Sequence, residues 1–329
     1  MKKTLESAFG IAPISTGVFA GELRICRALK IDVGADWEKA CRNMLEKDHK
    51  EGGFLLSQGA LIGQEQTISN KLAAEQTEFA VGQDNRNLYL AIECSDPRGT
   101  NLAANCREAD GGVWGGDFVE IFISPRHGVG NYYRFIVNPL GAKYEACGVD
   151  TGWPCGWEAK AVSGEKSWIA LVSIPFAGLK IQPDDKTIME LNICRGRCAE
   201  SVWEFSSWSY SAGSFHNPEN FGVMLLGDPM QCLQKSFLKS YREKYAQALD
   251  NFLKIQGGQI DDSGKESLDR MKNILDKIGA ELARADRTGA GFKELANIWI
   301  KTDKLMNKCD EVRDVYQNQA EKISATMWV

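Results

Sequence analysis

The fold is decided by the stretch Trp114-Gly-Gly-Asp-Phe-Val-Glu-Ile-Phe-Ile123, in which two kinds of side chain alternate after the glycines. Successive side chains of a β-strand point to opposite faces of its sheet. One row of this segment is aliphatic and suits a core: Val119, Ile121 and Ile123. The opposite row is Phe118, Glu120 and Phe122. The stretch therefore predicts a strand over residues 117–124 whose outer face combines a charge with aromatic rings.

The segment 131–138 is the expected antiparallel partner of this strand, joined to it by a hairpin turn at residues 125–128. Its apolar row is Tyr133, Phe135 and Val137, and its other row is Tyr132, Arg134 and Ile136. Adjacent strands share their faces, so Glu120 and Arg134 are expected together on the outer face. A face that mixes charge with aromatic surface is typical of ligand binding.

Further segments of the same kind fill the chain up to residue 226. They are separated by turns rich in Gly, Pro, Asn and Asp, a texture typical of sandwiches and barrels. The expected strands are 77–81, 87–94, 168–174, 187–195, 203–210 and 221–226. Gly227-Asp228-Pro229 is a natural boundary, because proline disfavours helix in the residue before it and starts helices well. We therefore predict a mainly β chain whose residues 1–228 form an antiparallel, jelly-roll-like β-sandwich.

Residues 229–329 show helical periodicity instead. Apolar residues recur every three or four positions in three segments, which begin at Phe237, Leu268 and Phe292. Each segment carries one apolar stripe, which predicts a bundle of about three α-helices. The stripes could instead bind a protein partner or a second copy of this chain, and this alternative stays open.

Composition excludes some partners. A formal net charge of −5 argues against a nucleic-acid partner, which usually meets a basic face. No apolar run is long enough to span a bilayer. Met1-Lys2-Lys3 begins as a secretory signal does, but residues 5–20 make a poor hydrophobic region. The ten cysteines include no C-x-x-C pair, so we expect buried thiols and up to one or two disulfides rather than a metal site.

The sequence does not contain the usual motifs of catalysis. A glycosidase needs two carboxylates that face each other, whereas Asp117 and Glu120 lie three apart on a strand and point to opposite faces. There is no G-x-S-x-G, H-E-x-x-H, phosphate loop or dinucleotide fingerprint, and the three histidines are scattered. We therefore expect no enzymatic activity.

Seven segments, in the right order, resemble motifs of family 9 carbohydrate-binding modules. The run Trp114–Ile123 matches the family signature W-x-x-D-x-V-E-I-F-I, and residues 79–92 resemble its early strand pair. The other similar segments are Ile31-Asp32 with 36–40, 168–176 (Leu171 in place of the usual acid), 191–195, Trp208-Ser209 and 215–222. The resemblance implies an antiparallel sandwich that binds carbohydrate, and it does not cover the helical region.

In this family two aromatic residues hold a terminal sugar by stacking against its flat C–H faces. By position the first is Trp114, and the second is Phe215, where tryptophan is usual. Glu120 corresponds to the ligand-binding acid of the family. The resemblance therefore implies a carbohydrate site at Trp114, Glu120 and Phe215, although Phe215 suits a core equally well.

The same resemblance implies further polar contacts. Arg134 lies near the place of the family's polar ligand contacts, and Arg195 and His216 could add donors. Two positions depart from the family pattern, since Ile136 stands in place of an arginine and Cys194 in place of a glutamine. These departures bear on whether the family's usual ligand, a cellulose or xylan end, is bound.

The sequence thus predicts a non-catalytic carbohydrate-binding module of an extracellular or cell-surface protein. No cofactor is expected, apart from a structural Ca²⁺ that the resemblance suggests without assignable ligands. One alternative is an assembly protein that uses the sandwich as a scaffold and its helices for contacts. Another is haem binding, which would need axial His or Met ligands. The loop Trp153–Trp157 could form an extra aromatic surface, or a cover held by Cys147 and Cys155.

Overall fold

The computed structural model describes residues 23–313, with the exception of 47–49, 57–70, 105, 110, 126–131, 149, 152, 185–186, 212–213, 257–261, 287–290, 292–293, 304, 307 and 311. The chain divides into two compact units, Met1–Pro229 and Met230–Val329. Most of the turn predicted at 125–128 lies outside the described residues.

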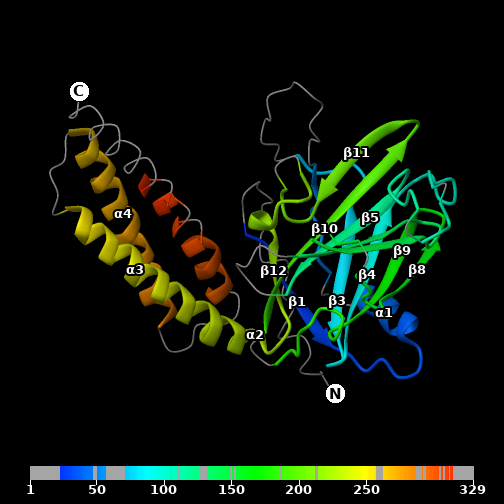
Figure 1. Cartoon of the computed structure of the whole chain (residues 1–329), viewed down its shortest axis with the longest axis horizontal. Helices are drawn as coiled ribbons and strands as arrows, with labels where there is room; N and C mark the ends of the chain where they lie inside the picture. The colour runs from blue at the N-terminus through cyan, green and yellow to red at the C-terminus, as the bar shows by residue number, and fades with distance from the viewer. Residues whose placement is uncertain are drawn as a thin grey trace, which may run out of the picture. The chain divides into compact units, whose positions relative to one another are not determined.

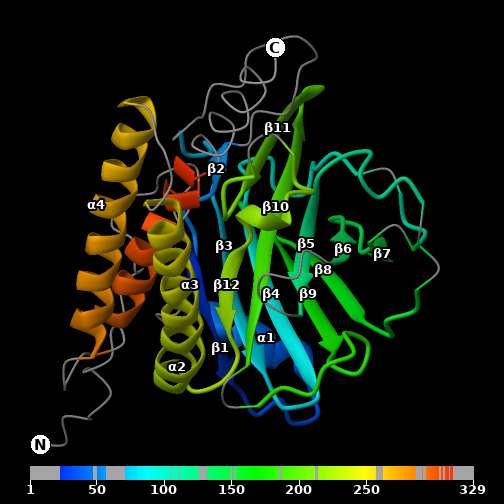
Figure 2. The same cartoon turned by 60° about the vertical axis from the view of Figure 1, so that its left-hand side comes forward.

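The described residues of the first unit form twelve strands in one hydrogen-bonded order, β7-β6-β5-β10-β12-β1-β3-β4-β9-β8, with β11 beside β10 and β2 beside β11 (Figure 1 and Figure 2). Their bounds are β1 Ile25–Lys30, β2 Leu55–Leu56, β3 Thr77–Gln83, β4 Asn87–Ser95, β5 Phe118–Ser124, β6 Tyr133–Val137, β7 Lys143–Cys147, β8 Glu158–Ser163, β9 Ser167–Pro175, β10 Ile188–Ala199, β11 Val202–Ser207 and β12 Gly222–Leu225.

Strand β1 connects two sheets. Its first half, Ile25–Arg27, pairs in parallel with β12, and its second half, Ala28–Lys30, pairs in parallel with β3. We call β7-β6-β5-β10-β12, with β11 and β2, the front sheet, and β3-β4-β9-β8 the back sheet. Within each sheet the paired strands are antiparallel. The chain therefore forms a mainly β sandwich (Figure 2).

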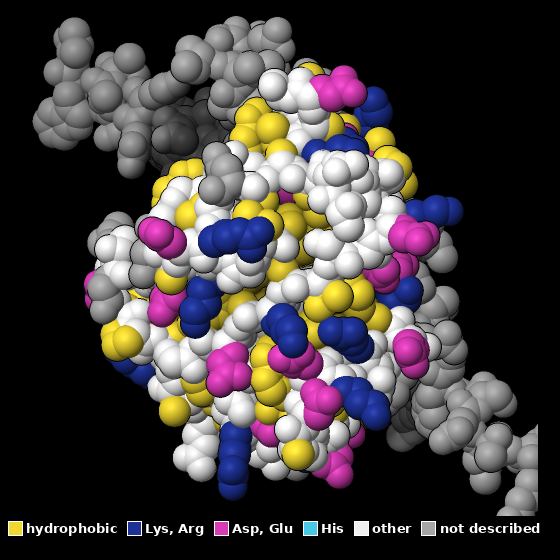
Figure 3. All heavy atoms as spheres, turned by 90° about the vertical axis from the view of Figure 1, so that its right-hand side faces the viewer, with side chains coloured by type: hydrophobic (Ala, Val, Ile, Leu, Met, Phe, Trp, Pro, Cys, Tyr) yellow, Lys and Arg dark blue, Asp and Glu magenta, His cyan; other side chains and the backbone are white. Residues whose placement is uncertain are grey.

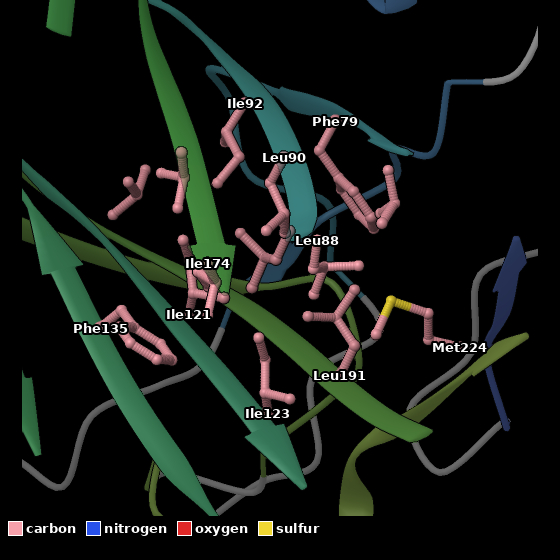
Figure 4. Close-up of a cluster of buried hydrophobic side chains, with 14 of the residues drawn as sticks. Phe79, Leu88, Leu90, Ile92, Ile121, Ile123, Phe135, Ile174, Leu191 and Met224 are labelled. Carbon is pink, nitrogen blue, oxygen red and sulfur yellow. The ribbon is translucent and has the colours of Figure 1, made fainter. Parts of the chain in front are cut away.

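The core fills the space between the two sheets. Side chains from β5, β6, β10 and β12 meet those from β3, β4 and β9, and Figure 4 labels ten of them: Phe79, Leu88, Leu90, Ile92, Ile121, Ile123, Phe135, Ile174, Leu191 and Met224. Each buried side chain of this size contributes roughly 1.5–3 kcal/mol relative to full exposure. The core rows predicted for β5 and β6 are confirmed.

The outer edges of the two sheets approach each other at Trp157, so the sandwich is nearly closed. The indole nitrogen of Trp157 donates to Glu145 Oε2 of β7 (2.7 Å), and the Trp157 carbonyl accepts from Lys143 Nζ (2.7 Å). Trp157 packs on Phe135, with ring centroids 5.1 Å apart. Trp153 is equally part of the core, where its ring lies 4.5 Å from that of Tyr133. The loop is therefore a cover and not an exposed aromatic surface.

That cover is held by packing rather than by a disulfide. Cys147 and Cys155 are free thiols, and no disulfide joins any cysteines of the described chain. Burial raises the pKa of Cys155 to about 12, helped by the charge of Glu145, so this thiol stays protonated at neutral pH. The loop therefore forms a cover, as one of the two alternatives predicted. The prediction that Cys147 and Cys155 hold this cover is wrong, because both are free thiols.

Helix α1 (Trp37–Leu45) lies on the outer side of the back sheet. Asp36 caps it, since its carboxylate accepts from the Lys39 amide at 3.0 Å. Cys41 and Met44 pack against Ala80, Tyr89 and Leu171 of the back sheet. One face of the back sheet is thereby covered within the unit.

The second unit is helical. It contains α2 (Pro229–Gln231), the π-helix η3 (Cys232–Phe237), α3 (Leu238–Gln256) and α4 (Asp262–Ala285), and residues 294–303 are helical as well. The ring of Phe237 stacks on Trp299, with centroids 4.7 Å apart and planes 10° apart. The expectation of about three helices is too simple. Among the described residues there are four α-helices with defined bounds, α1 to α4, besides the helical residues 294–303. One of the four, α1, belongs to the sandwich, and the short α2 and the π-helix η3 precede α3. No helix among the described residues is long and apolar enough to cross a bilayer.

Candidate functional site

The outer face of the front sheet carries the even-numbered side chains of β5, β6 and β10. In register across the strands lie Ile136, Glu120 and Cys194, and beside them Phe118 and Gly196. Two small apolar clusters cover this face, and Phe215 belongs to both; their other principal members are Val113, Phe118, Phe122, Tyr132, Ile136, Ala142, Tyr144, Cys194, Phe205 and Phe221. The face is therefore an aromatic layer that covers Glu120.

Glu120 and Arg134 form an ion pair on this face. Arg134 Nε donates to Glu120 Oε1, and the exposed fractions of the two side chains are 21% and 3%. Burial raises the pKa of Glu120, and the positive charge of Arg134 opposes that rise in part. The prediction that the two side chains share the outer face is confirmed, but Glu120 is covered rather than open to a ligand.

Arg134 itself remains available. Its guanidinium carbon lies 5.5 Å from the centre of the Tyr144 ring, in a cation–π contact. Nε is its only atom that hydrogen-bonds within the described residues. Its two terminal amino groups are thus left to donate to a ligand.

Trp114 is the exposed aromatic residue at the edge of this face, with 46% of its surface accessible. Its ring meets Tyr144 edge-on, with centroids 5.4 Å apart and planes at 89°. The contact leaves much of the indole surface to solvent. Trp114 and Arg134 therefore share Tyr144 as a neighbour, which places a stacking surface and hydrogen-bond donors side by side.

The loop that carries Trp114 is anchored by the next residues of the signature. A Cβ atom at Gly116 would lie 2.0 Å from the carbonyl oxygen of Ala103, so only glycine allows this close approach. The Asp117 carboxylate accepts from the Ala103 amide (2.6 Å) and from the Cys198 amide (3.1 Å). Gly116 and Asp117 thus have structural roles, and they hold Trp114 in place.

Phe215 and His216 lie at the other side of the aromatic layer. Phe215 is half-buried, and its ring meets Phe205 edge-on at 5.9 Å. His216 Nδ1 lies 2.8 Å from the hydroxyl of Tyr132. Burial lowers the pKa of His216, and the charge of Arg134 lowers it further, so its ring is neutral at pH 7. The ring of Phe215 thus packs against Phe205, whereas the ring of Trp114 contacts Tyr144.

Arg195, in contrast, lies apart from this face. It occupies the same row of β10 as the core residues Leu191 and Ile193, and only 1% of it is exposed. Its guanidinium donates to Asp96 Oδ2 (3.1 Å) and to the carbonyl of Ser95 (2.9 Å). The placement does not support the prediction of a ligand contact by Arg195, because its side chain is buried and both terminal amino groups donate to partners between the two sheets.

Asp96 is the centre of a charge network that the sequence did not reveal. Arg98 joins Asp96 (2.7 Å) to Asp117 (2.8 Å), and Arg197 donates to Asp96 at 2.9 Å. Burial alone would raise the pKa of Asp96, but the hydrogen bonds from Arg98 and Arg197 outweigh it and hold the pKa well below its usual range. The network ties the end of β4 to the start of β5 and the end of β10. The only signal for it in the sequence was Asp117 in the signature.

No group of three or more His, Cys, Asp or Glu residues in the described chain is arranged to hold a metal ion. The carboxylates of Asp96 and Asp117 are taken up by arginines and backbone amides. On the face shown in Figure 3, lysines and arginines are interspersed with acids and with hydrophobic patches, so that face carries no field of a single sign. Trp203 of β11 is a further exposed aromatic residue, which was not predicted as a site residue.

Comparison with known proteins gives a family match. A family model described as carbohydrate family 9 binding domain-like matches residues 61–228. No match is found among curated proteins. Among solved structures, the chain is similar to a proposed carbohydrate-binding protein from Bacteroides uniformis ATCC 8492, with 20% identity and a TM-score of 0.46, over 61% of this chain and 98% of that one.

It is also similar to a carbohydrate-binding module of family 9 from Caldicellulosiruptor kristjanssonii. With the glucose complex of that module the identity is 16% and the TM-score 0.41, over 62% of this chain and 95% of that one. With its cellotriose complex the values are 16% and 0.43, over 62% and 92%. The family model spans just over half of the chain and contains Trp114, Asp117 and Glu120 at the positions of the signature. The chain therefore belongs to the carbohydrate family 9 binding domain-like family.

Proposed function

We propose that the sandwich unit is a non-catalytic module that binds carbohydrate on the outer face of its front sheet. The observation that carries this proposal is the exposure of Trp114, at 46%, on a loop that Gly116 and Asp117 hold in place. A partly exposed indole offers a flat apolar surface and an N–H donor, which suits the C–H face and the hydroxyls of a sugar. Family membership supports the same reading.

Arg134 is the second part of the proposed site. Its terminal amino groups face no acceptor in the described residues, and Tyr144 contacts both Arg134 and Trp114. Glu120, at 2% exposure, is proposed to position Arg134 rather than to touch the sugar. Charge pairing within the site favours a neutral sugar, because the guanidinium is already balanced by a carboxylate.

The module is proposed to be accessory to glycan degradation or to attachment at a cell surface, and thus extracellular or at the cell surface. Its non-catalytic character is supported by the two signature carboxylates, since Glu120 pairs with Arg134 and Asp117 with Arg98. A jelly-roll-like topology belongs to the same proposal. It is supported by the way consecutive strands change sheets, from β4 to β5 and from β9 to β10.

Native affinity electrophoresis tests this proposal. The parent chain and Trp114→Ala are run through gels that contain soluble cellulose derivatives, xylans, and algal or host polysaccharides. Leu72→Ala is the control, because Leu72 is an exposed apolar residue (49%) that contacts neither Tyr144 nor Arg134 in any described interaction. We expect the parent and the control to be retarded in at least one gel and Trp114→Ala to migrate freely. Equal retardation of all three would contradict the site, and free migration of the parent in every gel would contradict the function.

A second candidate function is a scaffold for assembly. It is favoured by the cover over Glu120 and by the packing of Phe215 on Phe205, which occupy two of the family's three contact positions. This candidate predicts no sugar binding and an oligomer that dissociates when residues 230–329 are removed. Size-exclusion chromatography with light scattering on both chains distinguishes the two functions.

A further inference from the structure

A second exposed tryptophan lies on the same outer face as Trp114. Trp203 is 41% exposed and stands opposite Cys198 of β10, an even-numbered position and hence on the outer face. Next along this face, Phe205 stands opposite Gly196, which in turn stands opposite Phe118 of β5. Trp203 therefore continues the aromatic layer at the far end of the sheet.

The Trp203 ring packs against two other aromatic rings. It stacks on Phe205 with planes 6° apart and centroids 5.4 Å apart, and it leans on Phe118 at 6.4 Å. Its indole N–H makes no hydrogen bond within the described residues. A ring that is fixed on one face and open on the other can stack on a ligand with little loss of rotamer entropy.

Gly196 makes this arrangement possible. A Cβ atom there would lie 2.3 Å from the Phe118 ring, so the absence of a side chain lets that ring lie across β10. The Phe118 ring thereby crosses β10 at Gly196 and reaches from β5, which carries Glu120, to Trp203 on β11. The aromatic layer is continuous from β5 to β11.

The hairpin between β10 and β11 (Figure 2) carries Trp203 as the second residue of β11. Glu200 and Ser201 both have positive φ, 50° and 66°, as a tight primed turn requires. Val202 precedes Trp203, is 69% exposed and points to the opposite face of the strand. The tip therefore offers a matched control position one residue away.

The two tryptophans contact different parts of the sheet. Trp114 contacts Tyr144 on β7, and Trp203 lies on β11, and four interstrand steps of about 4.8 Å, about 19 Å in all, separate β7 from β11. That span exceeds a single sugar ring. Between the two lie Phe118, Phe205 and the Arg134–Glu120 pair.

We propose that this face binds an extended glycan chain, with Trp203 as a second stacking residue at the opposite end from Trp114. The inference rests on the proposed function and specifies its ligand: a run of several neutral sugar units rather than one terminal sugar. Each tryptophan contacts a different unit of the chain, and Arg134 donates to hydroxyls between them.

Length dependence of binding tests the inference. The full chain is titrated by calorimetry with oligosaccharides of increasing length, from disaccharide to hexasaccharide, prepared from a polysaccharide that retards the parent in gels. We expect the affinity of the parent to rise about tenfold or more with length. Trp203→Ala removes most of that rise, and Trp203→Phe, which keeps a flat ring, restores part of it. Val202→Ala behaves like the parent.

Three outcomes distinguish a failure of this inference from a failure of the proposed function. If Trp203→Ala keeps the full rise with length, the extended site is wrong while carbohydrate binding stands. If Val202→Ala loses the rise as fully as Trp203→Ala, the hairpin conformation rather than the ring is responsible, and Trp203 is not a stacking residue. If the parent binds none of the oligosaccharides or polysaccharides, both the function and the inference fall.

Discussion

Glu120 is an acid that the fold can bury only with a partner. Removing one member of a buried ion pair costs about 3–5 kcal/mol, because the other charge is left without compensation. Arg134 is 21% exposed, so water can relieve part of that penalty. We expect Arg134→Met to lower the free energy of unfolding by about 2 kcal/mol, measured by chemical denaturation at pH 7. The double variant Glu120→Leu with Arg134→Met recovers most of the loss, since no charge remains buried.

The same variant has a pH signature. Burial already raises the pKa of Glu120, and loss of the arginine raises it further. A folded state with a raised pKa keeps its stability at low pH and loses it as pH rises through that pKa. The deficit of Arg134→Met is therefore smallest near pH 4, about the ordinary pKa of glutamate, and grows towards pH 8. A deficit that is constant between these limits would show that the ion pair does not govern this site.

The residue type of Arg195 suggests a contact with the ligand, but the structure buries this side chain between the two sheets. In the run Leu191-Asn-Ile-Cys-Arg195, alternation puts Arg195 in the row of Leu191 and Ile193, both of which are in the core. The alternation thus indicated a core position for Arg195. An arginine at such a position can be interpreted only when the groups that pair with its charge are known. Asp96 and the carbonyl of Ser95 come from about one hundred residues earlier, which local sequence cannot supply.

The Asp96 network joins β4 of the back sheet to β5 and β10 of the front sheet, with which β4 is not paired. We expect Asp96→Asn to cost about 3 kcal/mol in unfolding free energy, because Arg195 would stay buried without a counter-charge. Glu78→Gln is the control: it breaks the exposed Lys50–Glu78 pair and should cost less than about 1 kcal/mol. Equal losses in the two variants, followed by urea denaturation, would refute a structural role for the network.

The network also predicts acid sensitivity. The pKa of Asp96 is held below its usual range, so the stability that it contributes is present above about pH 4 and is lost as pH falls through the folded-state pKa. The parent should therefore lose its advantage over Asp96→Asn only well below pH 4, as followed by thermal unfolding at successive pH values. An advantage that disappears between pH 7 and pH 5 would point to another group.

Strong strands were predictable, and weak ones were not. The alternation of β5 and β6 placed their core rows correctly because one face of each is fully buried. β8 escaped prediction because its sequence, Glu-Ala-Lys-Ala-Val-Ser, lies at a sheet edge and buries little. Helix α1 has a cap in Asp36, but residues 36–40 are expected from the sequence only as part of a family motif and not as a helix.

For the whole molecule, the division at Pro229 has a functional consequence. All residues of the proposed site, including Trp203, lie in the first unit, and the network of Asp96 is also complete within it. We therefore expect residues 1–229 alone to bind the same polysaccharide as the full chain, with an affinity within about threefold, in affinity electrophoresis. A truncated chain that is folded by circular dichroism yet does not bind would transfer the function to residues 230–329 or to both units together.

The site as a whole was only partly predictable. The signature located Trp114, Glu120 and, through strand pairing, Arg134 on one face. It could not show that Glu120 is covered, because the cover comes from Phe215 and other residues distant in sequence. Trp203 was missed because its importance depends on register, which sets Phe205 opposite Gly196 and Phe118.

The most direct measurement is an NMR titration of the indole N–H groups in the full chain, labelled with ¹⁵N at its nine tryptophans. Substitution by phenylalanine assigns the signals, and a polysaccharide fragment that retards the parent serves as ligand. We predict that the Trp114 and Trp203 signals shift, while those of the buried Trp168, Trp208 and Trp299 do not. Binding that leaves the Trp114 signal unchanged, or that shifts only Trp299, would contradict a carbohydrate site on the outer face of the front sheet.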